Sequence, residues 1–429
     1  MFEQILKNDI MKKALLLITL FIACTAGTLR AQWDSIVRFN QVVEDMVIYN
    51  SDLFIAGGFT QYDGNTCYWS GSYDGSSLTP HTTLVGGSGI RKMAVFGTDL
   101  YAVGMLSHSI SIGVDLWTGT TWTDGGGTNL SHSGIYADGN DLYVVDDNDL
   151  VRKKTGTGSF QTFYDFSTVG YLGPIIRYNN KLVFAGTFTS VSGVPANNIV
   201  QWDGTNWQAL GSGIAGPAMC MAVYNNELYV AGKLTSAGGS PVNNIAKWNG
   251  TSWSSVGTGI TGVSTYGIRD MKATAGGLFA VGQFTQAGSA TTKDVAMWNG
   301  SQWYSMMLNH GDVFVTCVEY FNNKVYVGTF DFNHAHLYRY MGTIGIDESN
   351  PDKNITLYPN PASDVITIEQ KQAAGESVIS VFDMSGKKKM VKTTRENKNR
   401  VDISGWNAGI YIVEVKSEKG IYRKKIIKD

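Results

Sequence analysis

Four histidines spread along the chain are the side chains whose type could most directly do chemistry: His108, His132, His310 and His334. Imidazole nitrogens bind zinc and copper, and metal sites of this kind usually take their ligands at short, fixed spacings. These histidines are far apart and show no such spacing. We therefore predict no metal ion or other cofactor, keep a copper or zinc site as the alternative, and treat the four residues as candidates for a ligand-binding surface.

Acidic residues gather at one point, where Asp146, Asp147 and Asp149 lie close together. A calcium loop needs further oxygen ligands at set positions, and none follows, so a solvated turn explains these residues more simply. We recognise no paired carboxylates, phosphate-binding loop or nucleophile with an adjacent base in the sequence. The sequence thus predicts no catalytic residue, with an active site assembled from distant segments as the alternative.

Tryptophans five residues apart form the third group, since indole rings can stack on sugars. Tyr73 and Leu78 take the same two positions in an earlier copy, and a short apolar run such as LFIAG, LYAVG or LYVAG precedes each copy. Seven copies of about 44 residues can be counted, and self-similarity with this period predicts a repeat architecture. The tryptophan pairs are Trp117/Trp122, Trp202/Trp207, Trp248/Trp253 and Trp298/Trp303.

Each repeat reads as four antiparallel strands. An alternating run meets a tight polar pair such as Asn225-Asn226, and Asn249-Gly250 separates the last two strands of its copy. Residues that tolerate positive φ between two β-prone runs predict hairpins. Seven such units predict an all-β protein whose residues 32–346 form a seven-bladed β-propeller. Packing between blades, worth at most about 5 kcal/mol for one buried indole, explains the tryptophans more simply than sugar binding.

Closure of the propeller is predicted at the N-terminus. The seventh copy ends at HLYRYMG without its final tryptophan-containing strand, and QWDSIVRF around Trp33 supplies such a strand at the other end of the chain. An open ring would leave an unpaired strand edge. We therefore expect the N-terminal strand to complete the seventh blade.

The repeats resemble kelch and galactose-oxidase-type propeller repeats, and the phrasing NIAKWNGTSW is similar to repeats of fungal cortical polarity-marker proteins. This resemblance implies a scaffold, and a fold does not fix function. In a four-stranded meander the tight turns lie on one face and the long connections on the other. We expect the face with the long connections to bind the ligand, and it includes the four histidines.

Charge divides the chain into two parts. Residues 33–346 contain 15 basic and 22 acidic residues, whereas residues 347–429 contain 15 basic and 12 acidic residues in a much shorter segment. This shift predicts a domain boundary near residue 347, after which the short strands read as a small Ig-like β-sandwich. Neither part has the basic excess of a nucleic-acid-binding protein.

The N-terminus reads as an export signal over residues 1–31, with Met11 as a candidate true start. Lys12 and Lys13 precede the apolar run ALLLITLFIA, which is too short to cross a bilayer, and no later segment predicts a transmembrane helix. Lipid anchoring at Cys24 is an alternative. The mature chain keeps three cysteines, which we expect to be buried free thiols: Cys67, Cys220 and Cys317.

Three motifs mark the last part of the chain. They are Tyr358-Pro359-Asn360-Pro361, the pair Gly409 and Tyr411, and a terminal basic-apolar run with Lys424, Lys425 and Lys428. In this order they resemble the type A C-terminal sorting domain of the type IX secretion system of Bacteroidetes. The resemblance implies transport through the periplasm to the cell surface or the medium, with the secretion machinery and its sortase as partners. It also implies removal of the domain, followed by release or tethering to lipopolysaccharide.

Together these features predict an exported, noncatalytic, monomeric propeller that binds a glycan or a protein. A secreted carbohydrate-active or oxidative enzyme, with its active site among the long connections, is the alternative. A structural or adhesive protein without a specific ligand is a third hypothesis. The long connections differ in length between copies, which favours one composite site over seven equal ones.

Overall fold

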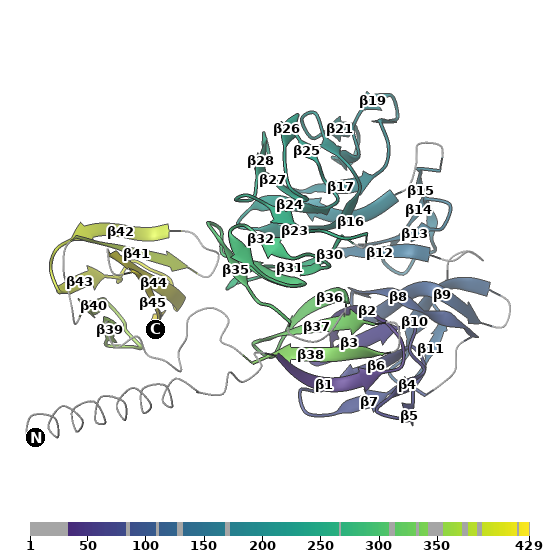
Figure 1. The fold of residues 1–429 in the computed structure, drawn as a ribbon, viewed down its shortest axis with the longest axis horizontal. Coiled ribbons are helices and arrows are strands. Elements are labelled where there is room, and N and C mark those ends of the chain that lie inside the picture. The colour runs from purple at the N-terminus through teal and green to yellow at the C-terminus, as the bar shows by residue number, and fades with distance from the viewer. Residues whose placement is uncertain are drawn as a thin grey trace, which may run out of the picture.

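The computed structural model describes two β-sheet regions (Figure 1). The first covers residues 33–341 except 83–85, 109–110, 127–131, 168–171, 266, 309–313 and 332–333, and the second covers 355–428 except 371–375, 384–387 and 418–419. The described residues form strands and turns without a helix. No helix long and apolar enough to cross a membrane is therefore found among them.

Seven antiparallel sheets follow one another in the first region, six of them built from consecutive segments of the chain and the seventh completed by a strand from the start of the region. Their strands are β2 (Val43–Tyr49), β3 (Asp52–Gly57), β6 (Ser70–Tyr73) and β7 (Leu78–Pro80); β8 (Gly86–Phe96), β9 (Asp99–His108), β10 (Ser111–Trp117) and β11 (Trp122–Asp124); β12 (His132–Asp138), β13 (Asp141–Asp146), β14 (Leu150–Thr155) and β15 (Gln161–Asp165); β16 (Leu172–Tyr178), β17 (Lys181–Gly186), β20 (Ile199–Trp202) and β21 (Trp207–Ala209); β23 (Ala218–Tyr224), β24 (Glu227–Gly232), β27 (Ile245–Trp248) and β28 (Trp253–Ser255); β30 (Ile268–Thr274), β31 (Gly277–Gly282), β34 (Val295–Trp298) and β35 (Trp303–Ser305); and β36 (Phe314–Phe321), β37 (Lys324–Phe330), β38 (Ala335–Tyr340) and β1 (Trp33–Phe39). We number these sheets one to seven.

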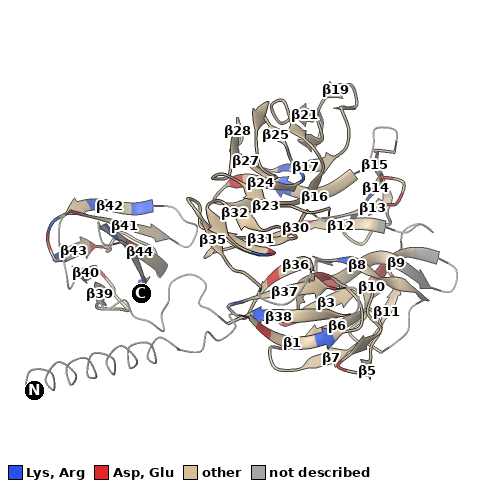
Figure 2. Ribbon diagram, in the orientation of Figure 1, with Lys and Arg blue, Asp and Glu red and all other residues tan. Residues whose placement is uncertain are grey.

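The first strands of the seven sheets contact one another in chain order, from β2 to β8 and on to β36, and β36 also contacts β2. In the seventh sheet, β1 pairs with β38 over its whole length, with Trp33 opposite Tyr340 and Phe39 opposite Ala335. The hairpin of β4 (Gln61–Tyr62) and β5 (Asn65–Thr66) comes from the first sheet's long connection and extends this sheet through the pair Phe39 and Tyr62. Charged residues are sparse on these sheets (Figure 2).

The predicted hairpin turns are present. Asn225 and Asn226 between β23 and β24 have φ of 51° and 59°, as the predicted tight turn requires. The Asn249-Gly250 hairpin differs in type, because four residues separate Trp248 from Trp253 and the side chain of Asn249 accepts the N–H groups of Thr251 and Ser252. The hairpin prediction is therefore confirmed, with an Asn side-chain turn in place of the two-residue turn.

The long connections, which the sequence predicts as loops, contain short paired strands. These are β18 (Ser190–Val191) with β19 (Val194–Pro195), β22 (Ile214–Ala215) with β25 (Ser236–Ala237) and β26 (Ser240–Pro241), and β29 (Ile260–Thr261) with β32 (Gln286–Ala287) and β33 (Ala290–Thr291). Asn198 and Asn244 donate side-chain N–H groups to the carbonyls of Ile214 and Ile260, at 2.8 and 2.7 Å. The repeated Asn residues thus fix these connections to the sheets.

The tryptophan pairs face each other across the two outer strands of their sheets. Trp248 lies opposite Trp253 and Trp298 opposite Trp303, with ring centroids 5.3 and 5.4 Å apart. Trp33 and Tyr340 take the same arrangement at 5.1 Å. The core prediction is confirmed for five of these residues, which are less than 9% exposed: Trp117, Trp122, Trp248, Trp298 and Trp303. Trp202, Trp207 and Trp253 are half-buried.

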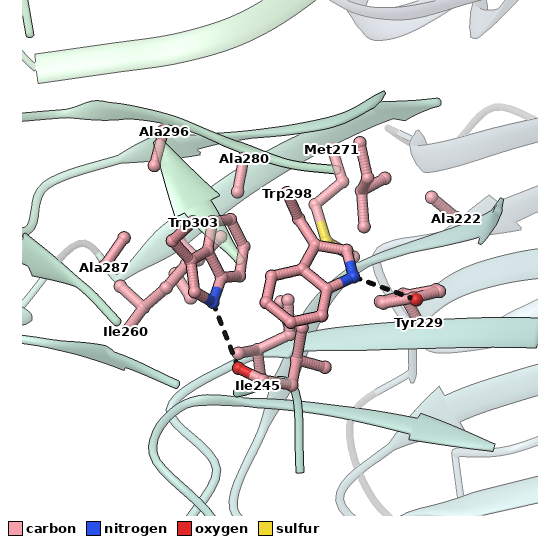
Figure 3. Packing of buried hydrophobic residues seen from close by; sticks show 14 of the residues in the cluster. Ala222, Tyr229, Ile245, Ile260, Met271, Ala280, Ala287, Ala296, Trp298 and Trp303 are labelled. Carbon is pink, nitrogen blue, oxygen red and sulfur yellow. Dashed lines mark hydrogen bonds between the residues drawn. The ribbon is translucent and has the colours of Figure 1, made fainter. Parts of the chain in front are cut away.

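The second tryptophan of a pair also hydrogen-bonds to the preceding sheet. The indole N–H of Trp253 donates to the carbonyl of Leu210 at 2.7 Å, and that of Trp303 donates to Val256 at 3.0 Å. Trp33 donates in the same way to Met306 at 2.7 Å. Figure 3 shows Trp298 and Trp303 packed in this core, where Trp298 Nε1 lies 3.3 Å from the hydroxyl of Tyr229. Buried donors are thereby satisfied across the boundary between sheets.

Sheet one joins sheet two through a variant of this contact. The indole N–H of Trp122 donates to Ser70 Oγ at 2.9 Å, and Ser70 Oγ lies 2.8 Å from His81 Nδ1. The imidazole of His81 packs on the ring of Trp117 with centroids 4.1 Å apart. Only 6% of His81 is exposed, and this burial lowers its pKa to about 4.

The second region is a two-sheet sandwich. One sheet has the strand order β39 (Ile355–Tyr358), β40 (Val365–Gln370) and β43 (Lys398–Asp402), and the other has β42 (Lys388–Thr394), β41 (Ser377–Asp383), β44 (Gly409–Ser417) and β45 (Gly420–Lys428). One hydrophobic core joins them, with fully buried Ile366 and Ile368 from the first sheet and Ile379 and Val381 from the second.

The buried His81 predicts a pH dependence of stability. Between pH 6.5 and about 4 the unfolded chain binds a proton on this residue that the folded chain does not, so the free energy of unfolding decreases as the pH falls through this range. The loss attributable to His81 is at most about 3 kcal/mol. Urea unfolding at a series of pH values should show a shallower decrease for His81→Gln than for the wild type. Equal pH profiles for the two proteins would contradict this role.

Candidate functional site

The first and last predicted sorting motifs meet at one end of the sandwich. The N–H of Ile427 donates to the side-chain oxygen of Asn360 at 2.8 Å, and the N–H of Ala362 donates to the carbonyl of Ile427 at 2.9 Å. Ala362 and Lys428 also form an isolated β-bridge. The Tyr358-Pro359-Asn360-Pro361 motif is thus joined to the end of β45.

The remaining motif lies beside the same strand. Gly409 pairs with Lys428 and Tyr411 with Ile426 at the start of β44. Tyr411 is buried, its hydroxyl donates to the carbonyl of Asn407 at 2.8 Å, and its ring packs 4.9 Å from Trp406. All three predicted motifs therefore belong to one continuous structure, although some 50 residues separate Pro361 from Gly409 in the sequence.

Basic residues lie beside these motifs. Lys424 and Lys428 are half-buried on β45 and flank the fully buried Ile426, while the side chain of Lys425 lies outside the described residues. Lys398 lies 5.4 Å from the ring of Tyr358, whose hydroxyl donates to Glu369 at 2.7 Å. Figure 2 shows further basic residues along β42.

A second candidate site is a groove of about 560 Å³ between sheets three and four. Its walls are Phe163 of β15 and Trp202 of β20, with hydroxyl and amide side chains and Lys153 around them. It lies beside the tight turn between β14 and β15, whereas the sequence placed the ligand on the opposite face. We call it the aromatic groove.

The aromatic groove arises where the tryptophan pattern is interrupted. In sheet three, Lys154 lies opposite Leu142, the position that Trp248 has opposite Leu228, and its ammonium is 5.9 Å from the ring of Phe160, which directly precedes β15. Lys154 also donates a hydrogen bond to the hydroxyl of Tyr101 at 3.1 Å. This contact is equivalent to the one between Trp298 and Tyr229 at another sheet boundary. A lysine thus takes the position of an indole.

A β-bulge in β15 adds the second change. Val151 pairs with Tyr164 and Arg152 with Thr162, so Phe163 is an extra residue. Such a bulge redirects a side chain. The ring of Phe163 lies 6.0 Å from that of Trp202, at an interplanar angle of 90°. The sequence signal was weak, because one extra residue within a repeat cannot be located by period alone.

Three of the four predicted histidines lie at strand ends on the side of the long connections. His108 ends β9, His132 begins β12, and His334 directly precedes β38. The side chains of His108 and His132 and the whole of His310 lie outside the described residues. His334 Nδ1 is 3.8 Å from Asp331 Oδ1. Within the described parts of the chain, no three His, Cys, Asp or Glu residues are grouped to hold a metal ion.

The three acidic residues of sheet three form hydrogen bonds and an ion pair at the turn between β13 and β14. One Asp146 oxygen accepts the N–H groups of Asn148 and Leu150, Asp147 pairs with Arg91 at 3.2 Å, and Asp149 accepts the N–H of Leu172. The turn interpretation fits these contacts, but Asp146 is only 1% exposed, so the prediction that the turn is solvated is wrong for this residue. Cys67, Cys220 and Cys317 are buried free thiols, as predicted, and burial raises the pKa of Cys67 to about 12.

Sequence reasoning missed a group of charges on the first strands. Lys92 Nζ lies 3.1 Å from Asp45, whose other oxygen accepts the N–H of Met93 from the next sheet at 2.7 Å. Asp270 likewise accepts the N–H of Val318 at 2.9 Å. Burial raises the pKa of Asp270, and nearby Lys92 opposes that effect. These carboxylates connect neighbouring sheets.

Comparison with known families supports both regions. Residues 356–429 match the family described as a secretion system C-terminal sorting domain, and residues 179–201 match a β-propeller domain of unknown function. Among the curated proteins, none matches this chain in sequence.

Solved structures with a similar fold have low sequence identity. YCF48 bound to a D1 peptide matches with a TM-score of 0.50 and 14% identity, over 73% of this chain and 98% of that one. PorZ, an essential bacterial surface component of the type-IX secretion system of Porphyromonas gingivalis, gives 0.49 and 13% over 91% of this chain. This chain spans 59% of the length of PorZ. The Dos1 propeller gives 0.42 and 10%, over 74% and 99%.

The chain is thus a β-propeller protein with a type IX secretion sorting domain at residues 356–429, which implies a Bacteroidetes source. The sorting domain implies contact with the secretion machinery and indicates export to the cell surface or the medium.

Deletion of residues 424–429 should stop export. It removes most of the strand that pairs with β44 and the Ile427 backbone that binds Asn360, so the sandwich loses the structure joining the motifs. We expect the protein to accumulate in the periplasm of its host, detected by immunoblotting of cell fractions, with an unchanged propeller melting transition. Lys392→Ala on the exposed face of β42 is the control and should be exported normally. Export of the truncated chain would contradict the assignment.

Proposed function

We propose that the seven sheets are the blades of one closed propeller and that β1 completes the seventh blade. The cyclic contacts of the first strands support this arrangement, since β36 contacts β2 as well as β30. The pairing of Trp33 with Tyr340 and the hydrogen bond from Trp33 to Met306 repeat the contacts of the other sheets. We keep the boundaries 1–31 for a signal peptide, 32–346 for the propeller and 347–429 for the sorting domain.

Loss of β1 should therefore destabilise the whole propeller. Deleting Trp33–Phe39 leaves the edge of β38 unpaired. It also exposes buried side chains of the clusters that contain Phe39 and Trp33, such as Phe59 and Leu308. We expect the melting temperature of the propeller transition to fall by well over 10 °C, measured by calorimetry. The conservative variant Trp33→Phe keeps the strand but loses the indole donor, so it should cost about 1 kcal/mol. An unchanged melting temperature after the deletion would refute closure by β1.

We infer that the exported protein is a noncatalytic binding protein whose ligand is a glycan or a protein, and that a sortase removes its sorting domain. The observation that carries the binding role is the aromatic groove. Trp202 is half-buried there, whereas Trp117, Trp248 and Trp298 at the same position in other sheets are 4 to 7% exposed. An open aromatic side chain in a concave site is a common feature of ligand pockets.

Binding should not depend on the predicted histidines. The purified protein and a variant with His108, His132, His310 and His334 all changed to Ala should retain the same partners from a host surface extract and on a glycan array. Metal analysis should find no stoichiometric copper or zinc. One metal ion per chain, or loss of binding in the variant, would favour an enzyme on the face of the long connections.

A further inference from the structure

We propose that the aromatic groove binds a neutral saccharide, with one sugar ring against Trp202 and its hydroxyl groups on the outer strand of sheet three. This inference rests on the proposed binding function and names its ligand class. Three properties of the groove carry it: its charge, its polar groups and its aromatic wall.

The groove offers no net charge to a ligand. Its lining contains no carboxylate, and the one cation in it, Lys153, is neutralised by Asp141, whose Oδ2 lies 2.8 Å from the ammonium. Thr155 donates a hydrogen bond to the other oxygen of Asp141 at 2.6 Å, which fixes the pair further. An anionic sugar would meet only an ammonium that Asp141 already neutralises, and desolvating the charge of an anionic or cationic ligand would cost free energy.

The polar groups of the groove are hydroxyls and an amide. Gln161 and Thr162 are exposed on β15, and the side-chain amide of Gln161 donates to Ser159 Oγ at 3.1 Å, within the groove. The amide oxygen and hydroxyl group are suited to the hydroxyl groups of a sugar, which both donate and accept hydrogen bonds.

The aromatic wall supplies the apolar contact. Phe163 stands at 90° to Trp202 and packs edge-on against Tyr143, with centroids 5.4 Å apart, so the wall is held by packing rather than free to rotate. A pyranose ring has an apolar C–H face with hydroxyl groups around its rim, which fits a partly exposed indole bordered by polar side chains. A volume of about 560 Å³ suits a short oligosaccharide.

In the test, the purified full chain is titrated with neutral oligosaccharides of glucose, xylose, mannose and N-acetylglucosamine. Binding is measured by calorimetry and by tryptophan fluorescence. Oligogalacturonate and a lysine-containing peptide are the charged probes. Gln161→Ala loses the amide, and Trp202→Phe keeps an aromatic residue of smaller area. Tyr304→Ala is the matched control. Tyr304 is an exposed residue on the outer strand of sheet six, as Gln161 is on the outer strand of sheet three, but it lies outside the groove.

We expect at least one neutral oligosaccharide to bind, each groove variant to bind it about tenfold more weakly, and Tyr304→Ala to bind like the wild type. Melting temperatures near that of the wild type show that the variants are folded. The proposal is overturned if no neutral oligosaccharide binds, if the groove variants bind it normally, or if only the charged probes depend on the groove. If the wild type retains a partner from surface extract but binds no neutral oligosaccharide, the binding function stands and the saccharide assignment fails. If the wild type retains none and binds no probe, both fail.

Discussion

The hydrogen bond from an indole N–H to the carbonyl of the preceding sheet is the contact on which the repeat depends. A four-stranded sheet has two faces to cover and cannot do so alone, so each unit needs a specific attachment to its neighbour. The acceptors Leu210, Val256 and Met306 each lie three residues after the second tryptophan of their own repeat. The residue three positions after the second tryptophan of one sheet therefore supplies the carbonyl that accepts the indole N–H of the next sheet. Gly257 after Trp253 has φ of 58°, and a Cβ there would lie 3.2 Å from Trp298, which explains the glycine in this turn.

The first strands of neighbouring sheets are connected by carboxylate hydrogen bonds instead of indole hydrogen bonds. Asp45 and Asp270 accept backbone N–H groups of the following sheet, and each lies at a β-bulge on the first strand of its sheet. A buried carboxylate is unfavourable unless it is paired or hydrogen-bonded. The backbone donors and Lys92 offset that cost. Between sheets one and two and between sheets six and seven both kinds of contact occur, the indole contact at the outer strand and the carboxylate contact at the first strand.

The sequence predicted what repeats and missed what does not. The strands, the tight turns at Asn225-Asn226 and the tryptophan pairs have local patterns that recur at one period, and the structure contains them. The paired strands within the long connections, such as β22 with β25, join segments of two repeats and have no local pattern. The aromatic groove depends on one extra residue, Phe163, and on Lys154 in the place of an indole. The sorting motifs could be named from the sequence, but the contact between Asn360 and Ile427 spans 67 residues and needed the structure.

The pairing of β1 with β38 also bears on how fast and in what order the chain reaches its native state. Ser35 and His336 are in contact across 301 residues, so β1 can pair with β38 only when the last of the seven sheets is also present. Contacts between such distant segments carry a large loop-closure entropy and form slowly. The six other sheets have all their main strands close in sequence. We therefore expect the pairing of β1 with β38 to be a late step of folding, and until it forms the edge of β38 is unpaired and open to aggregation.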